Sequence, residues 1–222
     1  MGTPYNPLDK MNLAQSIAEA LLECSVSPLS QTGGIIGAGV YAIYYNGGFE
    51  PYRPIAVRNR DGGFTQPIYV GKAVPQGARK GGLSLDASRG SALRTRLNQH
   101  ARSINEAENI ELADFHFRCL VVDDIWIPLG ENMMIEQFRP IWNTVIDGFG
   151  NNPTGIRRET QFRSAWDVLH PGRKRARNLA DSGIRPDAII RKLRAYFEGN
   201  ADTMILAEGA ADVETVDDEE DG

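Results

Sequence analysis

Arg96 and His100 are the two residues whose types and spacing are best suited to chemistry. They stand four residues apart in a segment with helical spacing of apolar residues, so both side chains project from the same helix face. A guanidinium carries a permanent charge that can stabilise the oxygens of a reacting phosphate, and an imidazole can take or orient a proton. The pair is therefore compatible with phosphoryl chemistry, although an exposed polar helix face would show the same spacing.

Two tyrosines stand in short apolar segments. Tyr41 ends the tripeptide GVY, and Tyr69 begins the tetrapeptide YVGK, which ends at Lys72. A phenol titrates near ~10, so a tyrosine that acts as a base needs a neighbouring cation. Lys72 is the nearest candidate for that cation within the two motifs. Tyrosine also favours strands, so both could be ordinary strand aromatics.

Glu131 is a candidate ligand for Mg²⁺, an ion that prefers oxygen ligands and keeps several of its waters. Glu136 is a rival ligand on the same predicted helix. Asn143 follows in the stretch PIWN, and it could fix the site through hydrogen bonds or a bridging water. A simple turn asparagine is the other interpretation of Asn143.

The pattern of apolar residues predicts the elements that must position these side chains. Strands are expected over residues 40–45, 67–70 and 115–121, where aromatic and β-branched residues dominate or alternate with polar ones. Helices are expected from about residue 7 to 24, from Ser91 to Ile104, over 129–138, near 161–168 and over 186–197. We therefore expect an α/β fold of the α+β kind, in which helices flank both faces of a small, mostly antiparallel sheet of three or more strands.

The ordered set of motifs resembles the GIY-YIG nuclease superfamily, with GVY standing for GIY and YVG for YIG. The arginine–histidine pair, the glutamate and the asparagine twelve residues after Glu131 follow in the order of that superfamily. The stretches GAGVYAIYY, PIYVGKAVP, PIWNTVIDGFGN and SAWDVLHPGR extend the resemblance to its type II restriction endonucleases, some of which cut the palindrome CCGCGG.

This resemblance implies a Mg²⁺-dependent hydrolysis of double-stranded DNA in which each residue has an expected role. Tyr41 would be the general base, Tyr69 would position the water or a phosphate oxygen, and Glu131 would hold the metal ion. His100 or Lys72 could instead relay the proton from Tyr41. The residues of the expected site are Tyr41, Tyr69, Lys72, Arg96, His100, Glu131 and Asn143.

An insertion separates the two motif tyrosines by 28 residues, whereas the minimal superfamily domain has a short hairpin there. We expect an inserted loop over residues 46–66 that is polar and irregular. Its side chains and those of a basic C-terminal part are candidates for contacts to phosphates or base edges. The candidate DNA-binding residues are Arg53, Arg58, Arg60, Gln66, Arg157, Arg158, His170 and Arg173, and His170 could instead pin the C-terminal part.

Charge is distributed unevenly along the 222 residues. Residues 199–222 contain nine acidic side chains and no Lys or Arg, which leaves 20 acidic residues against all 24 basic ones and a charge of +4 for residues 1–198. A basic body suits a polyanionic partner such as DNA. Only two cysteines are present and no apolar run is long enough for a membrane helix, so we expect a protein of the prokaryotic cytoplasm that does not engage a membrane.

These observations predict an N-terminal helical arm (1–30), a GIY-YIG endonuclease domain (31–198) and a disordered acidic tail (199–222). Cutting both strands of a palindrome requires two active sites related by a two-fold axis, so a homodimer is expected. A cognate DNA methyltransferase would be the genetic partner. The alternatives are a repair or homing nuclease of the same superfamily and a non-catalytic DNA-binding module of the same fold.

Overall fold

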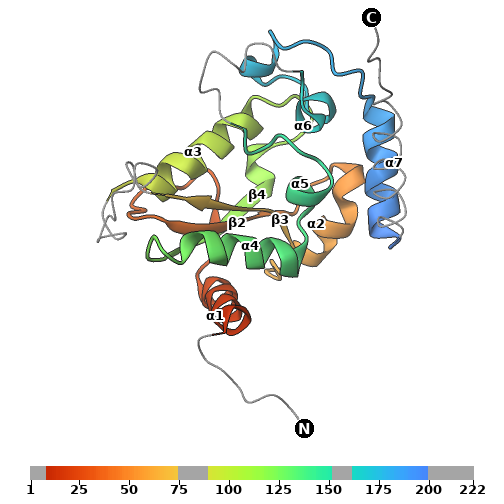
Figure 1. Ribbon diagram of the computed structural model, residues 1–222. Coiled ribbons are helices and arrows are strands. Elements are labelled where there is room, and N and C mark those ends of the chain that lie inside the picture. The colour runs from red at the N-terminus through yellow and green to blue at the C-terminus, as the bar shows by residue number, and fades with distance from the viewer. Residues whose placement is uncertain (1–8, 75–89, 152–161, 200–222) are drawn as a thin grey trace, which may run out of the picture.

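Four antiparallel strands form the sheet at the centre of the computed structural model, which describes residues 9–74, 90–151 and 162–199 (Figure 1). The strands are β1 (Ser27–Pro28), β2 (Gly39–Tyr45), β3 (Pro67–Ala73) and β4 (Phe115–Val121). Their order is β1-β4-β2-β3, so β2 is central and β3 is an edge strand. The predicted α+β class, the antiparallel sheet and its three main strands are confirmed, and β1 is an addition that sequence patterns did not predict.

The central strand β2 is buried at all seven positions. Val40, Ala42 and Tyr44 belong to an apolar cluster on one face, and Tyr41 and Ile43 to a larger cluster on the other. This alternation follows from the two-residue period of a strand. The sheet is therefore covered on both sides, as predicted.

On the first face lie α1 (Lys10–Glu23) and α4 (Ile127–Phe138), which pack against each other (Figure 1). Gly130 permits their close approach, because a Cβ there would come within 2.9 Å of Ile17. Arg139 ends α4 in the left-handed conformation, immediately before Pro140. The buried side chains of Ala18 and Leu21 attach α1 to the sheet. The division of the chain into an N-terminal arm, an endonuclease domain and an acidic tail stays a prediction.

The second face is covered by α3 (Ala92–Asn105), which turns its apolar side to the sheet, and by the short helix α5 (Ile141–Thr144), while α6 (Ala165–Leu169) lies farther from the strands (Figure 1). The last helix, α7 (Pro186–Phe197), packs on α6. Short connections between these elements in the described residues include the 3-10 helices η1 (Glu50–Tyr52), η3 (Leu112–Asp114) and η5 (Lys174–Ala176). The predicted helices over 91–104, 129–138 and 186–197 are confirmed to within two residues at their ends.

The insertion between β2 and β3 is not the irregular loop that we expected. It contains η1 and the helix α2 (Arg53–Asn59), whose Ile55 and Ala56 are buried in the main apolar cluster. Asn59 is completely buried, donates to the carbonyl groups of Tyr45 and Gln66 at 2.9 and 2.8 Å, and accepts from the Gln66 amide at 3.0 Å. Tertiary packing and this asparagine therefore order a segment whose composition is that of a loop.

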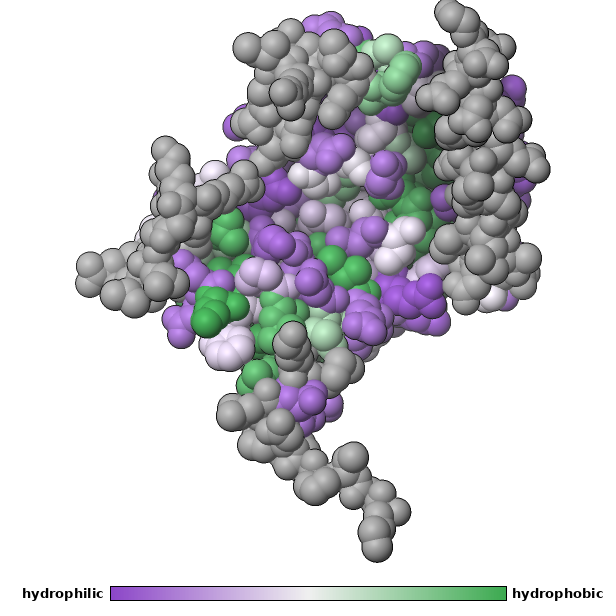
Figure 2. Space-filling model, viewed as in Figure 1, coloured by the Kyte–Doolittle hydropathy of each residue, from purple (hydrophilic) through white to green (hydrophobic). Residues whose placement is uncertain are grey.

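The surface seen in Figure 2 is mostly hydrophilic, with apolar residues in small groups between polar ones. Across the described residues, none of the helices combines the length and the apolar character needed to cross a membrane. Residues 200–222, which form all but the first residue of the predicted acidic tail, lie outside the part of the chain that the structure describes.

Candidate active site

Tyr41 lies on β2 directly opposite Gly71 on β3, and the missing side chain of Gly71 makes room for the phenol ring. A Cβ at position 71 would stand 2.4 Å from the Tyr41 hydroxyl and 2.9 Å from the Tyr69 ring. Real contacts of this kind are essentially never so short, so a side chain at position 71 would displace one of the two tyrosines. The glycine of YVG is therefore required by close packing of the site.

Tyr41 and His100 are joined by a hydrogen bond between β2 and α3, with 2.7 Å between the Tyr41 hydroxyl and Nε2 of His100. His100 is only 2% exposed. Its burial, followed by the nearby Arg96, holds the pKa of His100 well below the ordinary value of 6.5. The imidazole is therefore neutral at physiological pH, and its Nε2 can accept the hydroxyl proton of Tyr41.

The pKa of Tyr41 is raised well above 10, chiefly by complete burial and then by the neighbouring Tyr69, while Arg96 opposes the rise. This corrects the expectation that Lys72 lowers that pKa. Lys72 lies opposite Val40 in the β2–β3 register, one residue from the Tyr41–Gly71 pair, so its side chain belongs to the other face of the sheet. Arg96, and not Lys72, is the cation beside Tyr41.

Tyr69 completes the aromatic part of the site. Its ring centre lies 6.3 Å from that of Tyr41 and 5.1 Å from that of His100. Burial raises the pKa of Tyr69 and the Arg96 charge opposes this. Tyr69 stays a neutral hydroxyl that can donate or accept a hydrogen bond.

Arg96 extends from α3 and is half-buried beside both tyrosines. One of its terminal nitrogens donates to the carbonyl of Gly150 at 2.7 Å, and the other donates to Gln99 at 3.1 Å. These two bonds orient the guanidinium without neutralising it. The site therefore keeps a positive charge next to its proton-transfer pair.

Glu131 approaches β3 from α4, on the face opposite to His100, and forms an ion pair with Lys72 at 2.6 Å. The Glu131 side chain is 16% exposed and that of Lys72 is 39% exposed, so solvent reaches both. The described residues contain no group of three or more His, Cys, Asp or Glu side chains that could hold a metal ion. A single accessible carboxylate fits one ion that keeps most of its waters.

Asn143, on α5, pairs with the backbone of Val70 through both ends of its amide. Its Oδ1 accepts from the Val70 amide at 2.8 Å, and its Nδ2 donates to the Val70 carbonyl at 2.9 Å. Because β3 is an edge strand, these groups would otherwise lack a partner in a buried position. Asn143 thus fixes the strand segment that carries Tyr69 and Lys72, which agrees with the interpretation that it holds the site by hydrogen bonds.

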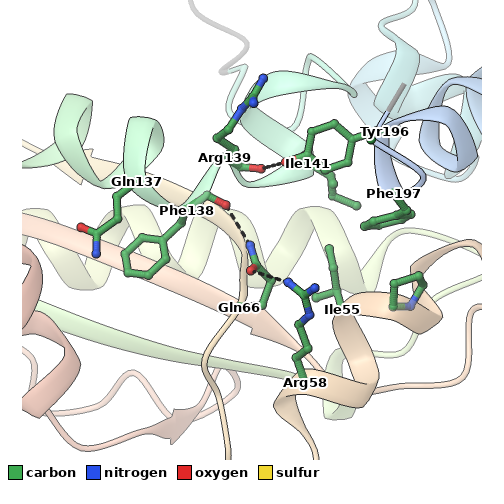
Figure 3. Close-up of a pocket in the computed structure, with 11 residues that line it drawn as sticks. Ile55, Arg58, Gln66, Gln137, Phe138, Arg139, Ile141, Tyr196 and Phe197 are labelled. Carbon is green, nitrogen blue, oxygen red and sulfur yellow. Dashed lines mark hydrogen bonds between the residues drawn. The ribbon is translucent and has the colours of Figure 1, made fainter. Parts of the chain in front are cut away.

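The residues expected to contact DNA fall into two groups, of which the first lies at the surface. Arg53, Arg58 and Arg60 are exposed on and just after α2. Arg58 donates to Gln66 at 3.2 Å, and Gln66 donates to the carbonyl of Phe138 at 2.8 Å. Both line a cavity of about 320 Å³ between α2, α4 and α7. Figure 3 shows their side chains beside those of the other lining residues.

The second group is buried or lies outside the described residues. His170 is completely buried between the Tyr52 hydroxyl and Asn109, at 2.5 and 2.8 Å. Arg173 is 1% exposed and paired with Asp167. These positions favour the interpretation that His170 pins the C-terminal part, and they give Arg173 the same kind of role. Arg157 and Arg158 belong to the residues that are not described.

Sequence reasoning missed Phe149 and Gly150 as parts of the site. Phe149 stacks on His100, with 4.6 Å between the ring centres and 19° between the ring planes, and Gly150 holds Arg96 through its carbonyl. The signal was present in the sequence, because both lie in the family-like stretch PIWNTVIDGFGN. Nothing local in the letters GFG, however, indicates a contact with a helix some 50 residues earlier.

Comparison with known protein families places the candidate site within a family match. The sequence model of the family described as RE_Eco29kI, Eco29kI GIY-YIG domain, matches residues 34–197, which is well over half of the chain and includes every residue of the candidate site. No curated protein matches the sequence.

Proposed function

The chain belongs to the Eco29kI GIY-YIG domain family, a family of type II restriction endonucleases, and on this premise we propose that it cuts a short palindromic DNA site with the help of Mg²⁺. The observation that carries the proposal is the hydrogen bond between Tyr41 and neutral His100, beside Tyr69 and the charged Arg96. Glu131 lies on the other face of strand β3, where it pairs with Lys72. Together they supply a proton acceptor, a positive charge and a metal ligand.

In the proposed reaction a water oxygen attacks phosphorus and the bond from phosphorus to the 3′ oxygen breaks. The products are a 5′-phosphate and a 3′-hydroxyl. Arg96 stabilises the negative charge that gathers on the phosphate oxygens in the transition state. Tyr69 donates a hydrogen bond to the attacking water or to a phosphate oxygen.

Tyr41 acts as a relay for the water proton. Its raised pKa makes a free phenolate too costly at neutral pH. If Tyr41 takes a proton from water while its own proton passes to Nε2 of His100, no phenolate has to accumulate. The 2.7 Å hydrogen bond supports this transfer, because the donor and the acceptor are already in contact. His100 holds this proton only transiently, because burial also makes the charged imidazole costly. The proton then passes to solvent, and a solvent water protonates the leaving 3′ oxygen.

Glu131 is the residue that would hold Mg²⁺, which when bound supplies Lewis-acid stabilisation of the phosphate and the leaving oxygen. Glu131 is half-buried and reachable by solvent. Lys72 fixes the orientation of the Glu131 carboxylate through their 2.6 Å ion pair. The carboxylate has two oxygens, so one can stay with Lys72 while the other serves as the ligand.

The palindromic site leads to the remaining parts of the proposal. The active site of one chain cuts one DNA strand, so two chains related by a two-fold axis would cut both strands. The active form would therefore be a homodimer. The family suggests CCGCGG as the first sequence to test, since Eco29kI cuts that site. A companion DNA methyltransferase that modifies the same site would protect the host.

Digestion of unmethylated DNA tests the proposal. The chain is incubated with plasmids that contain or lack CCGCGG, with Mg²⁺ and with a chelator, and is compared with Glu131→Gln and Glu136→Gln. Glu136 is exposed on the same helix and is the matched control. We expect discrete fragments that need Mg²⁺, that disappear with Glu131→Gln and that persist with Glu136→Gln. Uncut DNA with a folded protein that still binds duplex would instead indicate a binding module.

A further inference from the structure

Phe149 contacts two candidate catalytic residues, His100 and Tyr69, and is not itself catalytic. Its ring stacks on His100 at 4.6 Å and meets the Tyr69 ring edge-on at 5.0 Å and 79°. It is 1% exposed and is packed from behind by Trp142 and Trp166. One rigid ring thus sets the orientation of His100, which belongs to the proton-transfer pair, and of Tyr69 beside it.

Gly150, which follows Phe149 directly, controls a third group. Its carbonyl accepts the 2.7 Å bond from Arg96, and a Cβ at this position would stand 2.5 Å from the Tyr69 hydroxyl. Residues 148–150, which we call the GFG segment, therefore contact His100, Tyr69 and Arg96. The position of this segment determines how well three candidate residues are aligned.

Arg173 holds the GFG segment through its backbone carbonyl groups. Its Nη1 donates to the Phe149 carbonyl at 3.2 Å and its Nη2 donates to the Gly148 carbonyl at 3.1 Å. Its Nε donates to Asp167 at 2.6 Å, and its guanidinium lies over the Trp166 ring at 4.3 Å. The fork of one guanidinium thus joins α6 to two successive carbonyl groups.

The backbone of the segment also has to be held. Gly148 has a φ of +97°, and a Cβ there would stand 2.0 Å from Ser164, the N-cap residue of α6. A buried ion pair contributes little net stability against an apolar replacement, but it can specify one geometry. The Asp167–Arg173 pair is 4% and 1% exposed, and the geometry that it specifies is that of the GFG segment.

We propose that Arg173 is a positioning residue for DNA cleavage: with Asp167 it holds the GFG segment so that Phe149 and Gly150 align His100, Tyr69 and Arg96. Arg173 touches neither DNA nor the reacting atoms in this assignment. The effect on cleavage rests on the proposed nuclease function, whereas the effect on the orientation of His100 does not.

Arg173→Lys and Phe149→Leu test the proposal in the full-length chain. Lysine keeps the charge beside Asp167 but cannot span two carbonyl groups, and leucine keeps an apolar side chain but removes the stack. Under single turnover with saturating protein, we expect the cleavage rate to fall about 10- to 100-fold, as for misaligned catalytic groups. DNA affinity measured in a chelator should stay within about twofold, with an unchanged salt dependence.

Leu193→Ala is the matched control, because Leu193 is a buried residue of α7 in the same apolar cluster. Its cleavage rate should change only in proportion to the folded fraction. A rate for both test variants within twofold of the parent would overturn the proposal. Weaker binding of Arg173→Lys with a smaller salt slope would also overturn it, because that result would mean a direct phosphate contact.

A second readout is independent of activity. The chain has only three histidines, so the imidazole signals of His100 can be assigned by NMR from their loss in His100→Gln. We expect Arg173→Lys to shift these signals, because the ring of Phe149 moves relative to His100, and Leu193→Ala to leave them in place. Unchanged His100 signals in Arg173→Lys would contradict the positioning role even if the parent protein cut no DNA.

Discussion

At the scale of single residues, the core contains two tyrosine–histidine hydrogen bonds with different surroundings. Tyr41 bonds His100 at 2.7 Å beside Arg96, whereas Tyr52 bonds His170 at 2.5 Å and accepts from Trp142 at 2.9 Å. The second pair is packed against Phe49 and Trp142, and Trp142 in turn contacts Phe149. The pair at the site is proposed to move a proton and the other pair to hold the fold.

Tyr41→Phe and Tyr52→Phe should therefore fail in different ways. We expect Tyr41→Phe to lower the single-turnover cleavage rate by about 10²- to 10⁴-fold, because the proton relay is removed, with little change in DNA affinity. Tyr52→Phe should keep its rate per folded molecule but lose about 1–3 kcal/mol of stability, because Trp142 and His170 lose a buried partner. Cleavage kinetics and urea unfolding measure the two effects. Similar rate losses in both variants would argue against the relay.

At the scale of elements, β3 is an edge strand that two other elements must secure. Helix α5 pairs with it through Asn143, and α2 closes the connection that leads into it through Asn59. The positions of Tyr69 and Lys72 on β3 therefore depend on these hydrogen bonds.

Asn143→Ala should lower the free energy of unfolding by about 1–3 kcal/mol and also reduce cleavage, because the Val70 amide and carbonyl lose their partner. Asn143→Asp should not rescue either property, because a carboxylate can accept from the amide but repels the carbonyl. Urea unfolding and cleavage rates measured on the same preparations check this expectation. Full rescue by aspartate would show that only the acceptor is needed.

Helix α2 is also the element that we expect to meet DNA. Replacement of Arg53, Arg58 and Arg60 by alanine should weaken duplex binding and reduce the slope of log affinity against log salt by about 0.9 for each phosphate that the variant no longer neutralises. Stability should change by less than about 0.5 kcal/mol for each substitution, because these side chains are exposed. Binding titrations at several salt concentrations give the slope. An unchanged slope would show that α2 binds no phosphate.

At the scale of the whole molecule, buried neutral histidines make stability depend on pH. Burial lowers the pKa of His170 to about 3 and that of His100 well below 6.5. Both histidines bind a proton more readily in the unfolded chain. The stability that they contribute is therefore fully present above pH 6.5, and it is lost progressively as the pH falls toward their pKa values in the folded protein.

We expect the free energy of unfolding to fall between pH 6.5 and pH 5 by up to about 1.4 kcal/mol per pH unit for each of these histidines. Urea unfolding at a series of pH values measures the slope. His170→Asn should be less stable than the parent at pH 7, and its stability should fall less steeply with pH, by up to about 1.4 kcal/mol per pH unit, because one histidine fewer takes up a proton on unfolding. Stability that stays constant over this range would mean that the two imidazoles are not buried as neutral groups.

The sequence by itself determined the parts of this protein that depend on local pattern. Aromatic and β-branched residues bounded by turn signals predicted β2 and β3, alternation of apolar residues predicted β4, and helical spacing predicted α3 and α4. The ordered motifs indicated the family. These patterns are reliable because neighbours along a strand or helix keep a fixed geometry, whatever the rest of the fold does. The motif residues could thus be named, and Arg96 and His100 could be placed on one helix face.

Only the tertiary structure decided which groups meet. The partner of Lys72 is Glu131 and not Tyr41, the insertion is a helix held by Asn59, and Arg173 is buried behind the GFG segment. Each of these interactions joins residues that are distant in the sequence or lie on opposite faces of the sheet. Their geometry, and with it the pKa of each buried group, depends on packing and burial, which no local pattern encodes.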